Sequence, residues 1–229
     1  MRNSFILILI VAFGIMLYGL FDAFSGNEQL SELAKYYAQK ENIEKVQAAN
    51  LVTAVVVTYR GLDTLGEVTI LFLTAAIIGF FLHNKEEKRF LRENSEIFIT
   101  AAKLLIPIII LLGVYIFING HLTPGGGFQG GAVIASAVIL MILAFPEREF
   151  NSKFFTYLES ASGTIFVLLA ALGAIIGSGF LDNAIVPMGT FGKLVSAGVI
   201  PIIYSFVGLK VGSELSNILG NFKAVQSDN

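Results

Sequence analysis

Four polar residues interrupt an apolar run, and their spacing places them on one side of a helix. Arg60, Asp63, Glu67 and Thr74 are three, four and seven residues apart. Those steps return to one face of an α-helix. Ionisable groups inside a membrane are expensive unless they are paired or hydrated, so each is a functional candidate. Arg60 would keep Asp63 ionised, which leaves Glu67 to load and release a proton or small cation. The alternative is that these groups only anchor the helix.

Lys103 and Glu159 form a second candidate pair, each within another apolar run. Pro107 follows Lys103 by four residues and lacks the amide that would bond its carbonyl, so we expect a kinked turn there. Such irregular backbone is tolerated only where it faces protein or water. We therefore expect a Lys103–Glu159 ion pair inside a helix bundle. The alternative is that Lys103 extends to the lipid headgroups and Glu159 is interfacial.

The stretch from Gly120 to Ala132 reads GHLTPGGGFQGGA and holds six glycines. A flexible linker would carry Ser and charged residues, whereas this stretch runs directly into an apolar segment. Gly127, Gly131 and Ala135 recur every fourth residue, which on a helix forms a groove for close approach of another backbone. We interpret the stretch as a helix-packing motif, with an ordinary tight turn as the alternative. Its members are Pro124, Gly125, Gly126, Gly127, Gly130 and Gly131.

His121 opens this motif at the boundary of an apolar run. Its titration range suits proton transfer, which makes it a further ion-translocation candidate. The alternative is a hydrogen-bonded residue at the membrane interface.

Composition sets the protein class. The chain is 55% hydrophobic and 14% charged, with 20 Phe in 229 residues. These values indicate an all-α integral membrane protein. With no Cys and two His, the chain alone predicts no disulfide, metal site or cofactor. A net charge of −2 gives no reason to expect a nucleic-acid partner.

About six transmembrane helices are expected from the apolar runs. The run at 51–82 would reach about 48 Å as one helix, so we expect a break near residues 59–61. Residues 27–48 alternate charged and apolar side chains, which indicates an amphipathic surface helix. The first span could instead be a signal peptide. The expected spans are 5–21, 62–82, 97–118, one that follows the glycine motif and ends at residue 145, 157–180 and 193–211.

The distribution of Lys and Arg predicts the orientation. With the N-terminus inside, nine of the 15 basic residues lie on the cytoplasmic side and four lie opposite. Positive charge concentrates on the cytoplasmic side of membrane proteins. Both termini are therefore expected in the cytoplasm.

Two segments carry a family resemblance. HLTPGGGFQGGAV, followed by an apolar helix, resembles the signature of the B subunit of Mrp-type multisubunit cation/proton antiporters, with relatives in archaeal hydrogenase-type and sulfur-reducing respiratory complexes. TYRGLDTLGEVTILFLTAA resembles the C-terminal tail of the A subunit. The resemblance covers residues 97–212 and 50–82. It implies a two-span segment at 1–96 and a four-span B-like domain at 97–229.

The resemblance implies a non-catalytic subunit of a Na+/H+ antiporter-like complex, in the membrane arm of a respiratory complex. Other membrane subunits would be its partners, Na+ and H+ the transported ions, and the cell membrane its multi-pass location. A free-standing small-solute permease or channel is the alternative, although no inverted repeat is visible. An intramembrane enzyme lacks support, because no catalytic pair, metal-ligand spacing or nucleotide motif is present.

Overall fold

The computed structural model describes residues 2–23, 31–39, 44–81, 94–148 and 150–225. The chain divides into two compact units, residues 1–36 and 37–229. The first contains helix α1, Arg2–Ala23, and leads into the short helix α2, Glu32–Ala38. Apolar side chains along α1 are exposed on all sides. A helix of this kind suits lipid or partner surroundings.

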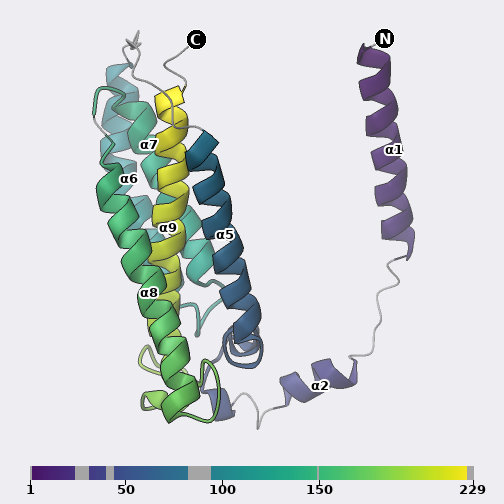
Figure 1. Ribbon diagram of the computed structural model, residues 1–229, viewed down its shortest axis with the longest axis vertical. Coiled ribbons are helices and arrows are strands. Elements are labelled where there is room, and N and C mark those ends of the chain that lie inside the picture. Colours follow the sequence, from purple (N-terminus) through teal and green to yellow (C-terminus); the bar gives the residue numbers. More distant parts are fainter. Residues whose placement is uncertain (1, 24–30, 40–43, 82–93, 149, 226–229) are drawn as a thin grey trace. The chain divides into compact units, whose positions relative to one another are not determined.

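The second unit is a helix bundle organised around its last helix (Figure 1). The helices are α5 (Gly61–Phe81), α6 (Glu96–Ile118), α7 (Gly127–Ala144), α8 (Ser152–Ile176) and α9 (Ile200–Val225). Helix α9 contacts each of the other four. Its residues Ile200, Ile203, Val207 and Val211 are buried in the shared core.

The fold is all-α, as predicted, and the chain is a multi-pass membrane protein. Among the described residues, α5, α6, α7 and α8 are long and apolar enough to cross a membrane. The apolar part of α1, Ile6–Phe21, is shorter. Helix α9 has 26 residues but carries several polar side chains that its neighbours cover. The count of six spans and the cytoplasmic termini stay predictions.

The expected break before α5 is present. A short helix α4, Leu51–Thr53, continues into π-helical turns at Ala54–Tyr59. Arg60 then leaves helical geometry, with φ −122° and ψ 34°, and α5 begins at Gly61. Gly61 lies directly against the Leu181 side chain, where a larger residue would collide. The glycine therefore lets the start of α5 pack against Leu181.

The predicted last span at 193–211 is wrong at both ends. The chain is not helical through residues 186–198: an isolated bridge joins Gly189 to Ser196, and Ala197 and Gly198 have positive φ angles of 62° and 58°. Helix α9 begins at Ile200 and continues to Val225. Helix α8 also differs from its predicted bounds, because Asn151 caps it by accepting from the Phe154 amide at 3.1 Å.

The expected surface helix at 27–48 is present only in part. Helix α2 is exposed, and its Lys35 and Glu32 form a 3.1 Å ion pair. Val46 and Ala48 instead belong to the core of the second unit, and the Asn183 amide donates to the Val46 carbonyl at 3.2 Å. Residues 27–30 and 40–43 lie outside the described residues.

Candidate functional site

The polar stripe, Arg60, Asp63, Glu67 and Thr74, lies on an exposed surface of the chain. Arg60 Nη2 is 2.5 Å from Asp63 Oδ2, and the two side chains are 61% and 55% exposed. Glu67 and Thr74 are exposed as well. The covered side of α5 presents different residues, Gly61, Thr64 and Val68. The stripe therefore faces away from the bundle, and the Arg60–Asp63 pair forms as expected.

The expected Lys103–Glu159 ion pair does not form. Lys103 is exposed on α6, whereas Glu159 is buried on α8, with 8% of its surface exposed. Glu159 Oε2 accepts from Asn217 Nδ2 of α9 at 3.0 Å. Helix α9 thus supplies the partner that was expected on α6.

His121 is fully buried in the loop between α6 and α7. Its Nε2 lies 3.4 Å from the Lys193 carbonyl oxygen, and its Nδ1 has no hydrogen-bond partner among the described residues. Burial lowers the pKa of His121, and backbone hydrogen bonds, led by that to Lys193, offset this effect only in part. The lowered pKa favours the neutral ring at pH 7. The ring links the loop between α6 and α7 to the loop before α9.

The glycine motif packs helices closely, as predicted, and its partners are within the chain. A Cβ at Gly131 would lie 2.7 Å from the Gly208 carbonyl oxygen of α9, and one at Gly127 would lie 2.7 Å from Val207. On another side of α7, a Cβ at Gly130 would lie 2.6 Å from the Gly113 carbonyl oxygen of α6. One glycine-rich helix turn therefore joins α6, α7 and α9.

The centre of the bundle holds a charged pair that the sequence alone did not reveal. Lys210 Nζ lies 2.7 Å from Glu214 Oε1, one turn along α9, and the side chains are 8% and 0% exposed. The second carboxylate oxygen of Glu214 has no partner among the described residues. The predicted last span ended at residue 211, directly after Lys210, so sequence reasoning placed this lysine at the edge of the span and not in the centre of a bundle. The available signal was the four-residue spacing of Lys and Glu after an apolar run.

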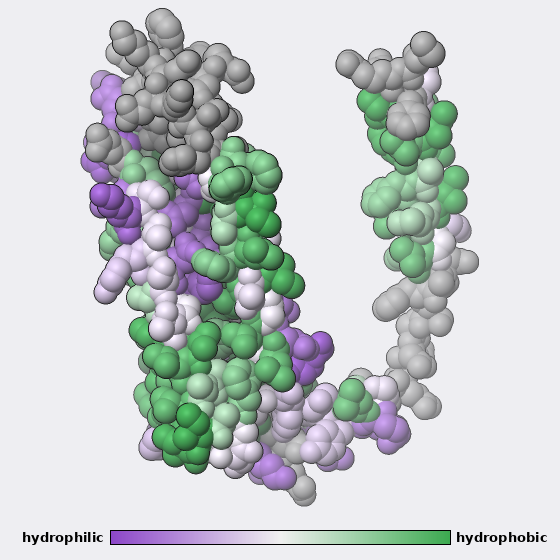
Figure 2. Space-filling view, viewed as in Figure 1, coloured by the Kyte–Doolittle hydropathy of each residue, from purple (hydrophilic) through white to green (hydrophobic). Residues whose placement is uncertain are grey.

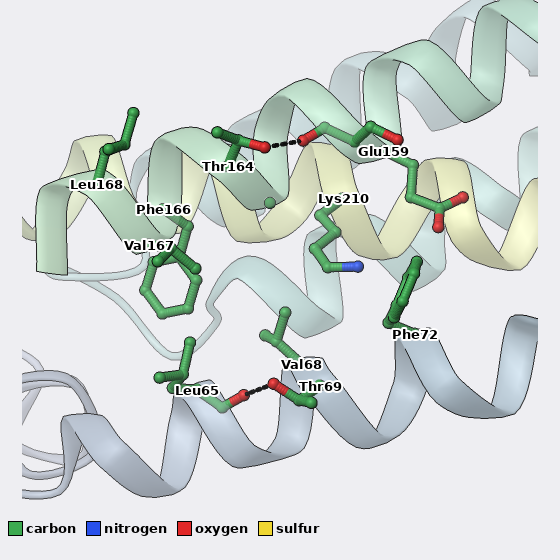
Figure 3. Close-up of a pocket in the computed structure, with 12 residues that line it drawn as sticks. Leu65, Val68, Thr69, Phe72, Glu159, Thr164, Phe166, Val167, Leu168 and Lys210 are labelled. Carbon is green, nitrogen blue, oxygen red and sulfur yellow. Dashed lines mark hydrogen bonds between the residues drawn. The ribbon is translucent and has the colours of Figure 1, made fainter. Parts of the chain in front are cut away.

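A pocket of about 450 Å³ opens beside this pair, between α5, α8 and α9 (Figure 3). Lys210 and Glu159 line it, together with apolar residues such as Phe166 and Val68. The Lys210 ammonium lies 5.0 Å from the centre of the Phe72 ring, which is a cation–π contact. Hydrophilic residues interrupt the apolar surface between α8 and α5 (Figure 2).

Small residues make room for the Lys210 side chain. A Cβ at Gly163 of α8 would lie 3.3 Å from the Lys210 side-chain carbons Cδ and Cε. The glycine therefore lets the lysine stem lie flat against α8 and reach the pocket. Within the described residues, no group of three or more His, Cys, Asp or Glu is arranged to hold a metal ion.

Two family models match the chain. Residues 97–217 match a domain related to the MnhB subunit of the Na+/H+ antiporter, and residues 1–94 match the MbhE family, which is named for one of the subunits of MBH. An uncharacterized protein of Methanocaldococcus jannaschii is 34% identical over 197 residues, covering 73% of this chain and 74% of the relative. The mnhB2 protein of Staphylococcus aureus, named as a putative antiporter subunit, is 41% identical over 103 residues, which cover 45% of this chain and 64% of that protein.

Two solved structures share the fold. A chain of the membrane-bound sulfane sulfur reductase, an archaeal respiratory membrane complex, is 42% identical with a TM-score of 0.80, covering 96% of this chain and 97% of that one. A chain of the Mrp complex from Dietzia sp. has a TM-score of 0.75 at 23% identity, which shows the fold alone. This chain spans 27% of that longer chain and is covered completely.

These matches confirm the resemblance that the glycine motif carries. They also extend it, since the match to residues 1–94 includes the first 49 residues, which lie outside the segments of the predicted resemblance. Both solved relatives are chains within membrane complexes.

Proposed function

This chain belongs to the family defined by the domain related to the MnhB subunit of the Na+/H+ antiporter, and we propose that it is a non-catalytic subunit of an ion-translocating membrane complex. The sulfane sulfur reductase chain, similar over nearly its whole length, supports a place in the membrane arm of a respiratory complex. Na+ and H+ are the proposed transported ions. Any redox chemistry of the complex belongs to other chains.

The exposure of Glu67 carries this proposal. Glu67 lies on a helix apolar enough to cross a membrane, about 9 Å along it from Gly61 at 1.5 Å per residue. A carboxylate cannot face lipid at that depth without a large loss of solvation. The exposed stripe therefore needs a polar neighbour or water beside it. We propose that a neighbouring subunit covers this face of α5 and that ions pass between the two chains.

Within the stripe, Arg60 and Asp63 have each other as partners, and this leaves Glu67 as the group that exchanges its charge. Arg60 donates to Asp63 through Nε as well, at 2.6 Å, which fixes both side chains. Lys103 is exposed on α6 and is a second proposed contact with a neighbour. His121 is assigned a structural role in the loop rather than a place on the path.

The separate family matches support two segments of different origin along the chain. We propose that residues 1–96 form a two-span segment related to the antiporter A-subunit tail. Residues 97–229 would form the B-like domain. The α5 stripe would then belong to the first part, and the glycine motif to the second.

The experiment measures Na+ and H+ flux in vesicles that contain the reconstituted complex, together with its subunit inventory. Glu67→Gln keeps the shape of the side chain but cannot titrate, so we expect an assembled complex that has lost most of its flux. Thr74→Val is the control on the same stripe, because that hydroxyl donates within its own helix, to Ile70 at 2.9 Å. Unchanged flux from the Glu67→Gln complex would contradict the proposed path.

A further inference from the structure

A file of polar side chains leads from one end of the bundle to its interior. Ser152 and Thr156 are exposed near the start of α8. Asn217 of α9 lies 3.5 Å from Ser152 through its Oδ1, 3.3 Å from Thr156 and 3.0 Å from Glu159. Beyond Glu159 lie the Lys210 ammonium and the Phe72 ring (Figure 3). The file therefore joins the exposed start of α8 to buried charges.

The charges at the inner end of the file do not balance. Glu159 and Glu214 are both buried, and Asn217, which bonds to Glu159, lies three residues after Glu214 on α9. Lys210 is the single buried cation beside them in the described part of the chain, and it is hydrogen-bonded to Glu214. Two carboxylates and one ammonium leave a net charge of −1. An uncompensated buried charge is strongly destabilising, so a neutral arrangement is favoured.

Among the described residues of the surrounding helices, no further cation is buried beside these carboxylates. Helix α7 contains no charged residue. The charged residues of α5, Asp63 and Glu67, are exposed, as are Glu96 and Lys103 on α6. On α8, Lys153 is exposed in the first turn. At the level of Lys210, the neighbouring side chain of α5 is the Phe72 ring.

We propose that Glu159, Glu214 and Lys210 form a binding site for one exchangeable proton inside the bundle. The proton forms an O–H bond on one of the two carboxylates as an O–H bond breaks in the water species that delivers it. The proton can bind either the unpartnered Glu214 oxygen or a lone pair of Glu159. It is therefore shared between the two carboxylates and is not assigned to one of them. Lys210 keeps the other carboxylate ionised. The file of Ser152, Thr156 and Asn217 is its route of exchange.

This site is separate from the α5 stripe, and its existence does not depend on the proposed function, although its use in transport does. Infrared difference spectra of the reconstituted complex at neutral pH test it directly, because a protonated carboxyl has a C=O band that a carboxylate lacks. Subtracting the Glu159→Gln spectrum from that of the intact protein should show one carboxylic acid. Glu214→Gln should show the same loss. Lys210→Met should add a second carboxylic acid, since no cation then holds either group ionised.

Glu147→Gln is the matched control, because Glu147 is an exposed carboxylate in the loop after α7. It should leave the band unchanged. Absence of a carboxylic-acid band in the difference spectra of both Gln variants would overturn the site. If Glu214→Gln fails to assemble, Glu159→Gln still decides the matter, because it keeps the Lys210–Glu214 pair. Flux from the same vesicles tests transport independently: a band with normal flux keeps the site but removes it from the ion path.

Discussion

The Asn217 amide donates to the Glu159 carboxylate over 3.0 Å, and this bond fastens α9 to α8 within one helical turn of the Lys210–Glu214 ion pair. Asn217 also reaches the Thr156 hydroxyl at 3.3 Å. One amide thus connects the exposed start of α8 with buried charge. Its removal should affect both the stability of the bundle and the exchange of ions with its interior.

Asn217→Leu should destabilise the α8–α9 contact by about 1–3 kcal/mol, the usual penalty for leaving a buried polar group without its partner. The measurement is unfolding of the purified complex in mild detergent. Thr164→Val is the control, since that hydroxyl bonds to Ser160 of its own helix, at 2.8 Å. Equal stability of the two variants would show that the Asn217 bond contributes little.

Gly131→Ala should destabilise the bundle by about 1–3 kcal/mol through overpacking. The added methyl would meet the Gly208 carbonyl oxygen at 2.7 Å and the Gly212 nitrogen at 2.9 Å, and backbone atoms cannot turn aside as side chains do. Gly66→Ala on α5 is the matched control, because no described residue has an atom within 4 Å of its added Cβ. Thermal unfolding of both variants checks the prediction, and a stable Gly131→Ala protein would contradict the close-packing argument.

Asp63→Asn should lower the yield of the assembled complex while the bundle itself stays folded. Arg60 would lose its carboxylate partner on a surface that we propose to be covered by another subunit, and an unpaired interfacial charge is costly. Subunit inventory after purification gives the yield. Glu32→Gln, which breaks the exposed ion pair of α2, should leave the yield unchanged. Normal yield from Asp63→Asn would indicate that water solvates Arg60.

Asp182 makes the loop between α8 and α9 sensitive to acid. Its carboxylate accepts from the Ser178 and Ala184 amides at 2.7 and 2.8 Å, and these bonds lower the pKa of Asp182 from 3.8. A depressed pKa in the folded state contributes stability above the unfolded value, and this contribution disappears as pH falls through the folded value.

Asp182→Asn should therefore be less stable than the intact protein at neutral pH. The difference should shrink as pH falls below about 3.8, the unfolded value. Unfolding curves of both proteins on either side of that pH provide the comparison. A difference that persists in acid would assign the effect to the shape of the loop rather than to the charge of Asp182.

The sequence was sufficient to predict the apolar helices and the glycine packing. Hydrophobic runs of membrane length appear as α5 and α6 within one residue of their predicted bounds, and α7 ends one residue before its predicted end, because lipid contact requires apolar side chains along the whole span. Gly127 and Gly131 were assigned to close packing because no larger residue permits it. Their partner α9 could not be identified, since small residues show that a backbone approaches but not which one.

Lys210 and Glu214 were missed for a physical reason. Hydropathy identifies helices that face lipid, whereas the most buried helix of a bundle is shielded by protein and can carry polar residues. The apolar residues 194–199 suggested the start of a span, yet they form a loop. The Lys103–Glu159 prediction failed similarly, because sequence spacing does not determine which helices are neighbours.

The polar character of α9 has a consequence for how the chain enters the bilayer. A helix with a buried lysine and glutamate is a poor substrate for insertion on its own, since each charge opposes transfer into lipid by about 2.5–3.5 kcal/mol. Synthesis delivers α9 after the four apolar helices α5–α8. It can therefore insert into a groove that already offers Thr156 and Glu159 as partners for Asn217, together with the glycine surface of α7. In this order of insertion, the four apolar helices would pack first, and α9, the helix least soluble in lipid, would then pack between them.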